Sequence, residues 1–363
     1  MVTTNPPREK DWINIAFLSL TPIIGVFGTL AYALTFGVQW WEPVLFLVFY
    51  ALVGLSVTAG YHRLYAHKGY EAHPLVQGFF LFFGAMALQN GVLQWASDHR
   101  VHHRYVDKDW DPYSIKRGGL WAHIFWLFYK RPAHETFDNS PDLKKNPLVM
   151  LQYRASNWIG IIAGLGIPTL IGWALGSALG GLLWGGFLRI VVIHHTTFFV
   201  NSLSHLYGTQ PYSEETSARD NWLLAFVTNG EGYHNFHHRF PSDFRNGTRW
   251  YHWDPTKWLI RALAAVRLAD GLRRTPRAVI EKARLEIAMR HAEGRLTHLT
   301  ADVRELVSRR LEEAARFLER ASANRQRARS VKRSRLAERA CLARARKNRL
   351  AALELLSTTT ETA

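Results

Sequence analysis

The chain alternates between long apolar runs and segments that carry most of its charge. Four of the runs reach the roughly 20 residues that an α-helix needs to cross the hydrocarbon core of a bilayer. They are residues 13–36, 43–61, 157–176 and 182–203. The pattern therefore predicts an all-α integral membrane protein with four transmembrane helices.

A fifth apolar run, 75–96, is interrupted by Gln89, Asn90 and Gly91. Polar residues and a glycine are unfavourable in the middle of a lipid-exposed span. We therefore expect this run to form an interfacial or re-entrant segment instead of a full span.

Basic residues orient the four spans. Lys and Arg are missing from the linkers 37–42 and 176–181, whereas 62–156 and the chain after residue 205 carry many. Because basic loops stay on the cytoplasmic side, we expect both termini in the cytoplasm, with 62–156 and 206–275 forming a helical cytoplasmic cap. The predicted location is the bacterial inner membrane.

The end of the chain differs in composition from the rest. Residues 271–363 hold 23 Lys and Arg against 11 Asp and Glu, most of the net charge of +16. We expect a membrane-embedded domain over 1–275 and a basic tail over 276–363 that is helical or partly disordered. Such a tail is either solvated or bound to anionic lipid headgroups. It has no recognisable nucleic-acid-binding module, which argues against nucleic acid as a partner.

Histidines dominate the candidate chemistry. The sequence has 17 histidines and one cysteine, Cys341, so imidazole is the expected metal ligand. Nine of the histidines lie in four stretches that the topology places on the cytoplasmic side: His62 and His67; His99, His102 and His103; His205; and His234, His237 and His238. Nine imidazoles suit two ions, each with four or five nitrogen ligands, and their softness favours iron, copper, nickel or zinc.

The spacing of these histidines predicts how they point. Positions i, i+3 and i+4 share one face of a helix, so the three histidines of each H-x-x-H-H stretch, 99–103 and 234–238, should point the same way. His62 and His67 are five residues apart and diverge on an ideal helix. We therefore expect one of them to reach each of the two metals.

Together these stretches resemble one family. GYHRLYAH (60–67), DHRVHH (98–103), DPY (111–113), NSLSHLYG (201–208) and NGEGYHNFHHRFP (229–241) are similar, in order and spacing, to the motifs of the membrane-bound fatty acyl desaturases, most closely the delta-9 acyl-CoA (stearoyl-CoA type) group. The similarity covers about residues 10–260. It implies an oxidoreductase of fatty acid biosynthesis that uses two iron ions and O2 to place a cis double bond in a saturated long-chain acyl-CoA.

The resemblance also implies a ligand set. The nine histidines above would bind the two irons, and Asn201 would contact a metal through water. Glu231 and Asp243 are candidate acceptors for the N–H groups of the ligands, because metal-binding imidazoles usually donate their second ring nitrogen.

Candidate substrate contacts have weaker support. Trp95 is a candidate tunnel wall, although bundle packing explains such an aromatic equally well. Phe46 and Tyr50 lie on the second span where the resemblance implies a tunnel floor, so shrinking either should lengthen the accepted chain. Four residues offer charge at the membrane surface for coenzyme A or a phospholipid headgroup: Asp98, Arg100, Lys130 and Arg131.

Electrons must come from a separate protein. The chain has no Gly-rich dinucleotide fingerprint, and His73-Pro74 is followed by Leu75 instead of the Gly-Gly of a fused cytochrome b5 domain. The basic cap and tail would attract an acidic ferredoxin, flavodoxin or cytochrome b5 type donor.

Three polar residues fall inside the fourth span. Arg189 lies 16 residues before His205, near the far side of the membrane. Its side chain is expected either to face the protein interior, as intramembrane charges usually do, or to snorkel to the interface. His194 and His195 are expected to make hydrogen-bonded packing contacts and not to bind metal.

Three other functions fit parts of the pattern. The same irons would serve an acyl-lipid desaturase of other regiochemistry or a diiron fatty acid hydroxylase. A metal transporter is a non-enzymatic alternative, but no acidic or histidine path crosses the spans.

Overall fold

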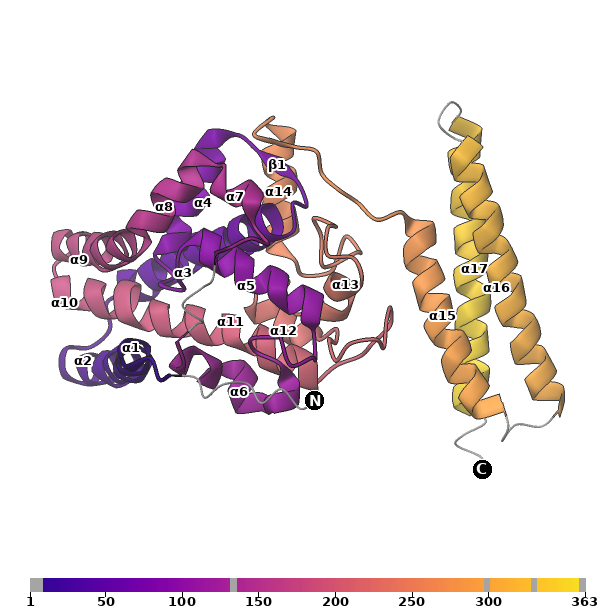
Figure 1. The fold of residues 1–363 in the computed structure, drawn as a ribbon, viewed down its shortest axis with the longest axis horizontal. Helices are drawn as coiled ribbons and strands as arrows, with labels where there is room; N and C mark the ends of the chain where they lie inside the picture. The colour runs from indigo at the N-terminus through magenta and orange to yellow at the C-terminus, as the bar shows by residue number, and fades with distance from the viewer. Residues whose placement is uncertain (1–8, 131–135, 297–300, 328–331, 359–363) are drawn as a thin grey trace. The chain divides into compact units, whose positions relative to one another are not determined.

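The computed structural model describes residues 9–130, 136–296, 301–327 and 332–358. They form two compact units. The first consists of the described residues up to Thr209 and of Thr216–Arg274, and the second of Gln210–Glu215 and the described residues from Thr275 onward. Each unit is drawn in Figure 1 and is described by itself.

Four long apolar helices dominate the first unit (Figure 1). They run over Trp12–Phe36, Trp41–Ala66, Pro147–Ala174 and Ala178–Leu206. Their α-helical parts are α1 (Trp12–Pro22), α2 (Thr29–Phe36), α3 (Trp41–Leu55), α8 (Pro147–Trp158), α9 (Gly164–Ala174), α10 (Ala178–Gly181) and α11 (Arg189–Leu206). The predicted all-α membrane fold with four spans is confirmed.

Each of the four helices contains a π-helical segment, in which hydrogen bonds run from residue i to i+5. These segments are Ile23–Gly28, Ser56–Ala66, Ile159–Ala163 and Leu182–Leu188. The π-helical segment of the second span is fully buried and ends one residue before His67. π-Helical turns often occur at functional sites, and this one has a direct effect on the histidines.

The fifth apolar run is divided into two helices. α4 (Pro74–Ala85) ends before the interruption, and α5 (Val92–Tyr105) begins after it. In the turn between them, Leu88 and Asn90 adopt positive φ angles of 53° and 72°, which stop a right-handed helix. Neither helix is long enough to cross a bilayer.

Arg189 faces the protein interior and does not snorkel, so the structure agrees with the first of the two alternatives. The side chain is fully buried and donates hydrogen bonds to the backbone carbonyl groups of Met86, Gly164 and Gly185. Carbonyl acceptors inside the bundle replace the water that a snorkelling guanidinium would reach.

Short elements complete the first unit: α6 (Gly119–His123), α7 (Pro141–Lys144), α12 (Trp222–Val227), α13 (His234–Arg239), α14 (Pro255–Ala265), and the 3-10 turns Ile115–Arg117 and Phe125–Phe128. β1 (Glu71–Ala72) pairs antiparallel with β2 (Ala269–Asp270), which ties the chain before α4 to the end of α14. A buried core that includes Tyr61, Phe80, Leu93 and Ile260 joins these elements to the second span.

The second unit is a three-helix assembly of α15 (Arg277–Leu296), α16 (Ala301–Arg327) and α17 (Lys332–Thr358). On α16 the buried residues are Val307, Leu311, Ala314, Leu318 and Ala321. Their spacing alternates between four and three, the heptad pattern of packed helices. The apolar seam explains why this charged sequence forms packed helices.

Candidate metal centre and substrate cavity

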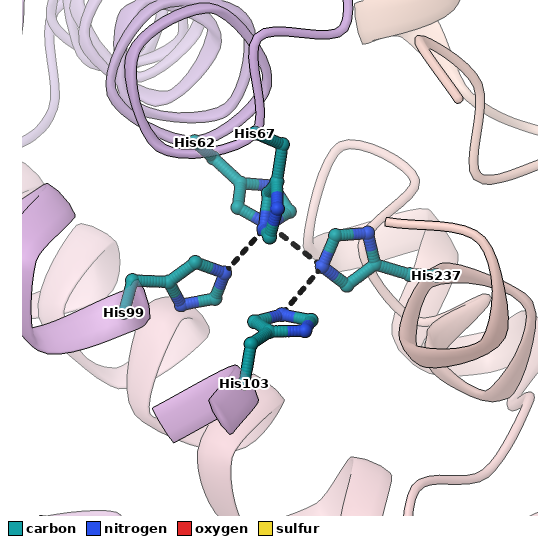
Figure 2. Close-up of side chains that lie close together, drawn as sticks. All are labelled: His62, His67, His99, His103 and His237. Carbon is teal, nitrogen blue, oxygen red and sulfur yellow. Dashed lines mark hydrogen bonds between the residues drawn. The ribbon is translucent and has the colours of Figure 1, made fainter. Parts of the chain in front are cut away.

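Four segments bring the nine histidines together. His62 and His67 lie at the end of the second span, three histidines lie on α5, His205 ends α11, and three lie on α13. They form two groups in which the ligand nitrogens lie within 4.8 Å of one another: His62, His67, His99, His103 and His237 in the first, and His102, His205, His234 and His238 in the second. Figure 2 shows the five rings of the first group turned toward one centre.

His62 and His67 belong to the same group, so the prediction that they reach different metals is wrong. Their ring centroids lie only 4.8 Å apart. The physical reason is the π-helical end of the span, where the amide of His67 donates to the carbonyl of His62 at 3.0 Å. The wider π turn brings residues i and i+5 onto one face.

The histidines of each H-x-x-H-H stretch do not all point the same way, which corrects a second prediction. On α5, His99 and His103 enter the first group and His102 enters the second. On α13, His237 enters the first group and its neighbour His238 the second. Adjacent helical residues point about 100° apart, so a short helix between the two centres supplies ligands to both.

The second ring nitrogens of several ligands are held by acceptors. His62 Nδ1 lies 2.8 Å from Glu231 Oε2, and His102 Nδ1 lies 2.9 Å from Asp111 Oδ1. His205 Nδ1 lies 2.7 Å from Ser217 Oγ, whose own hydroxyl donates to Asp107. Acceptors at Nδ1 place the ring proton there and leave Nε2 as a lone-pair donor.

Two carboxylates differ in their electrostatics. Burial opposes ionisation of Glu231, but Arg63 and His62 outweigh it and hold the pKa of Glu231 at about 2. Burial raises the pKa of Asp111 to about 7, although the carboxylate accepts hydrogen bonds from two backbone N–H groups, which lower its pKa. Burial also lowers the pKa of His99, His237 and the other described ligands outside the spans, which favours neutral imidazole.

Hydrogen bonds alone do not account for this arrangement. His237 Nε2 lies 3.0 Å from Nε2 of both His62 and His103, and a neutral ring has at most one proton to share. Two nitrogens bound at about 2.1 Å to one ion lie about 3 Å apart when the bonds are at right angles. The buried, neutral and convergent donor set therefore fits a metal ion in each group.

Asp111→Asn should weaken metal binding about 10- to 100-fold, the usual cost of losing an acceptor behind a histidine ligand. The amide can present its NH2 to His102 Nδ1 and so favour the wrong tautomer. Metal content after dialysis against a series of buffered metal concentrations measures the change. Asp109→Asn, an identical change at an exposed site two residues away, is the control and should leave the affinity at the wild-type value.

A mostly apolar cavity of about 130 Å³ opens beside the first histidine group. His62 and His99 form its metal end, and Asn201 and Asp98 are also in its wall. Trp95 lines the cavity, stacks on His99 with ring centroids 5.1 Å apart and donates from Nε1 to Gln89 Oε1 at 3.3 Å.

Neither of the two candidate floor residues, Phe46 and Tyr50, lines the cavity. Phe46 stacks on Tyr50 with centroids 6.1 Å apart, and the Tyr50 hydroxyl donates to the carbonyl of Val227 at 2.5 Å. The lining itself includes Gly54, one turn farther along α3, and Thr228, which follows Val227. Tyr50 thus contacts the residue before Thr228 of the lining, without lining the cavity itself.

The charged headgroup candidates are mostly engaged elsewhere. Arg100 forms a bidentate ion pair with Asp142, at 2.7 and 2.9 Å, and donates to the carbonyl of Tyr65, which argues against the predicted headgroup role. Lys130 is half-exposed and pairs with Glu9 at 2.6 Å. Arg131 lies outside the described residues.

The sequence predicted only some of the residues that contact the second ring nitrogens of the ligands. Glu231 is an acceptor for His62, as expected, whereas Asp243 forms a bidentate ion pair with Arg245. Asp111 and Ser217 were missed as ligand acceptors. Asp111 lies in the quoted DPY stretch, so a signal was present for it, but Ser217 lies in a loop without a motif.

Comparison with known proteins agrees with this geometry. Residues 39–269 match the model of the family described as "Fatty acid desaturase". The chain belongs to the fatty acid desaturase family. The matched range includes all four histidine stretches, so the two histidine groups are those of a desaturase family member.

Three relatives illustrate the similarity. Acyl-CoA desaturase 1 of Saccharomyces cerevisiae is 38% identical over 282 residues, which cover 77% of this chain and 55% of the yeast protein. The sn-2 palmitoyl-lipid 9-desaturase of Nostoc sp. (strain 36) is 35% identical, with 75% of this chain and 93% of that protein covered. Stearoyl-CoA desaturase 4 of Mus musculus is 36% identical, with 76% and 79% covered. The chain thus spans about half the length of the yeast relative.

Proposed function

We propose that this desaturase family member is an O2-dependent diiron fatty acyl desaturase that introduces a cis double bond, at the delta-9 position, into a saturated long-chain acyl-CoA. The observation that carries the proposal is the pair of histidine groups, with five and four members, beside an apolar cavity. Side chains offer no oxidant strong enough for an unactivated methylene, which is why the cavity must adjoin a redox metal.

Each set of residues has a defined task in this proposal. The nine histidines would hold two iron ions, which when bound supply the O2-dependent oxidising chemistry. Glu231, Asp111 and Ser217 orient the imidazoles through Nδ1. Asn201, which lines the cavity, would contact a metal through water. Trp95 and the apolar walls align the acyl chain and exclude water from the centre.

Acyl-CoA is the substrate that we favour. Relatives named acyl-CoA or stearoyl-CoA desaturases include proteins of yeast, sheep and mouse, while the Nostoc relative is named for a lipid-bound substrate. An acyl-lipid substrate is therefore the second candidate. The thioester and the phospholipid both deliver a saturated chain to the same apolar cavity.

The electron source and the location complete the proposal. A separate donor of ferredoxin, flavodoxin or cytochrome b5 type would deliver electrons, attracted by the positive net charge of +16. The four apolar helices would place the protein in the bacterial inner membrane with both termini in the cytoplasm. Residues 1–275 would be the catalytic domain and 276–363 a separate basic domain.

Product analysis tests the proposed function. The chain is expressed in a host with a known lipid profile, and the purified protein is given stearoyl-CoA or a saturated phospholipid with O2 and a reductant. A new cis-unsaturated acid from stearoyl-CoA supports the proposal, and one from the phospholipid alone supports the acyl-lipid alternative. A hydroxylated product, or metal uptake into vesicles without O2 consumption, would refute desaturation.

Tyr50→Ala should extend the accepted chain by two or more carbons. Removing the ring frees space one turn before the lining residue Gly54 and deletes the hydrogen bond to Val227, the neighbour of the lining residue Thr228. Competition between saturated acyl-CoA substrates of different lengths, analysed by mass spectrometry, measures the shift. Tyr50→Phe keeps the ring and should leave chain length unchanged; equal product profiles in all three proteins would remove Tyr50 from the tunnel floor.

A further inference from the structure

The turn between α4 and α5, residues 86–91, forms one wall of the cavity. Leu88, Gln89 and Asn90 all line the space that adjoins His62 and His99. Leu88 and Asn90 also have left-handed backbone conformations, which non-glycine residues adopt only when surrounding contacts hold them. The position of this wall therefore depends on the contacts that hold the turn.

Three side chains of α11 form hydrogen bonds with the turn. Arg189 donates to the carbonyl of Met86, and His194 Nε2 lies 2.7 Å from the carbonyl oxygen of Ala87. Farther along the helix, Thr197 Oγ1 accepts from Gln89 Nε2 at 3.0 Å. His194 and Thr197 are three residues apart and share one face of α11. Arg189 lies five residues before His194, points away from that face, and reaches Met86 through its long side chain.

Arg189 connects more elements than the other two anchors. Its Nη2 donates to the carbonyl of Gly164 in the third span at 2.7 Å, and its Nε donates to Gly185 one turn earlier at 3.1 Å. The planar guanidinium thus links backbone carbonyl groups of the turn, the third span and the fourth span, and a lysine ammonium does not reproduce this planar geometry.

The packing around Arg189 leaves little freedom. A methyl group added at Gly164 would lie 3.3 Å from Met86 Cβ and 3.4 Å from Arg189 Nη2. A buried cation in a membrane span is costly and is retained when it has a task. The three carbonyl contacts of Arg189 involve none of the nine histidines.

We propose that Arg189 is a positioning residue, which together with His194 sets the depth of the turn and thereby selects which methylene of the acyl chain lies beside the metal centre. The inference rests on the proposed function. It predicts that loosening the turn changes where the double bond forms before it changes how much metal the protein binds.

The position of the double bond is the first measurement. Arg189→Met and Arg189→Lys should each raise the share of products unsaturated at neighbouring positions at least tenfold, with iron per chain unchanged. Gly164→Ala, whose methyl group would press against Met86 and Arg189 without removing the charge, should act in the same direction with a smaller change. His194→Gln, which retains a donor, should stay closer to the wild-type product than His194→Leu.

Leu188→Met is the matched control, because it alters a neighbouring residue on the same helix without touching the three anchors. It should keep the wild-type product distribution. If Arg189→Met fails to fold, Arg189→Lys and Gly164→Ala still decide the question.

Hydrogen exchange of the peptide that contains residues 86–91 is the second measurement and needs no turnover. Exchange there should accelerate at least tenfold in Arg189→Met and remain at the wild-type rate in Leu188→Met. Wild-type protein that makes no unsaturated product would refute the proposed function, while the exchange result would still report on the turn. Unchanged exchange and unchanged regiochemistry in a folded, iron-loaded Arg189 variant would overturn this inference.

Discussion

Replacing His102 with alanine is expected to remove the unsaturated product entirely and to lower the iron content from two ions per chain to about one. His102 is one of four histidines in the second group, and its ring is 2% exposed. Four ligands leave no spare donor, because a histidine site with three remaining nitrogens holds a first-row metal far less tightly. Both histidine groups must be loaded for the proposed reaction.

Iron analysis and product analysis on the same preparation check this result. His291→Ala is the control, since His291 lies on α15, outside both histidine groups, and is exposed. It should retain two irons and wild-type product levels. A His102→Ala protein that keeps both irons and forms product would show that the second histidine group is not a metal site of the reaction.

The sequence was sufficient for the spans because lipid imposes a simple rule on them. A helix that crosses the bilayer must be apolar over about 20 residues, and this pattern identified all four long helices. The break in 75–96 was also visible, because Gln89, Asn90 and Gly91 stand out in an apolar run. What these residues contact on α11 was not visible, since it depends on which helices pack together.

The sequence was not sufficient for the division of the histidines. Ideal helical geometry predicts that residues five apart diverge, yet His62 and His67 meet because the span ends as a π helix. No residue pattern in the span marks that change of hydrogen bonding. The sequence likewise does not show that His102 and His103 belong to different groups, because this depends on where the surrounding helices lie.

Acceptors behind the ligands were partly predictable. Glu231 lies three residues before His234, yet it serves His62, which is far away in the sequence. Ser217 reaches His205 only because a long loop returns to α11 and is held by Asp107. Short-range motifs identify candidate acceptors, but tertiary folding decides which ligand each of them orients.

Glu231→Gln should weaken both the fold and the first metal site. Glu231 Oε1 accepts from Arg63 at 2.8 Å, and Oε2 accepts from His62 Nδ1 at 2.8 Å and from Asn246 at 2.7 Å. A glutamine has only one acceptor atom for these three donors. Breaking a buried ion pair by neutralising one partner costs about 3–5 kcal/mol, and loss of the His62 acceptor should weaken metal binding about 10- to 100-fold.

Thermal unfolding in detergent and metal titration measure the two effects. Asp243→Asn is the matched control, because it neutralises another buried carboxylate, the partner of Arg245. It should lower stability and leave metal affinity unchanged. Wild-type affinity and stability in Glu231→Gln would contradict the role of Glu231 at both partners.

A second substitution separates the two roles of Glu231. Arg63→Met removes the cation that has lost its pairing with Glu231 in Glu231→Gln and keeps only the pairing with Asp254, and replacing both members of a buried pair costs less than removing one. The double variant should therefore unfold at a higher temperature than Glu231→Gln alone, although Asp254 then loses its own contact with Arg63. Metal affinity should not recover, because His62 Nδ1 still lacks its carboxylate. Recovery of both quantities together would mean that Glu231 acts on the metal site only by stabilising the fold.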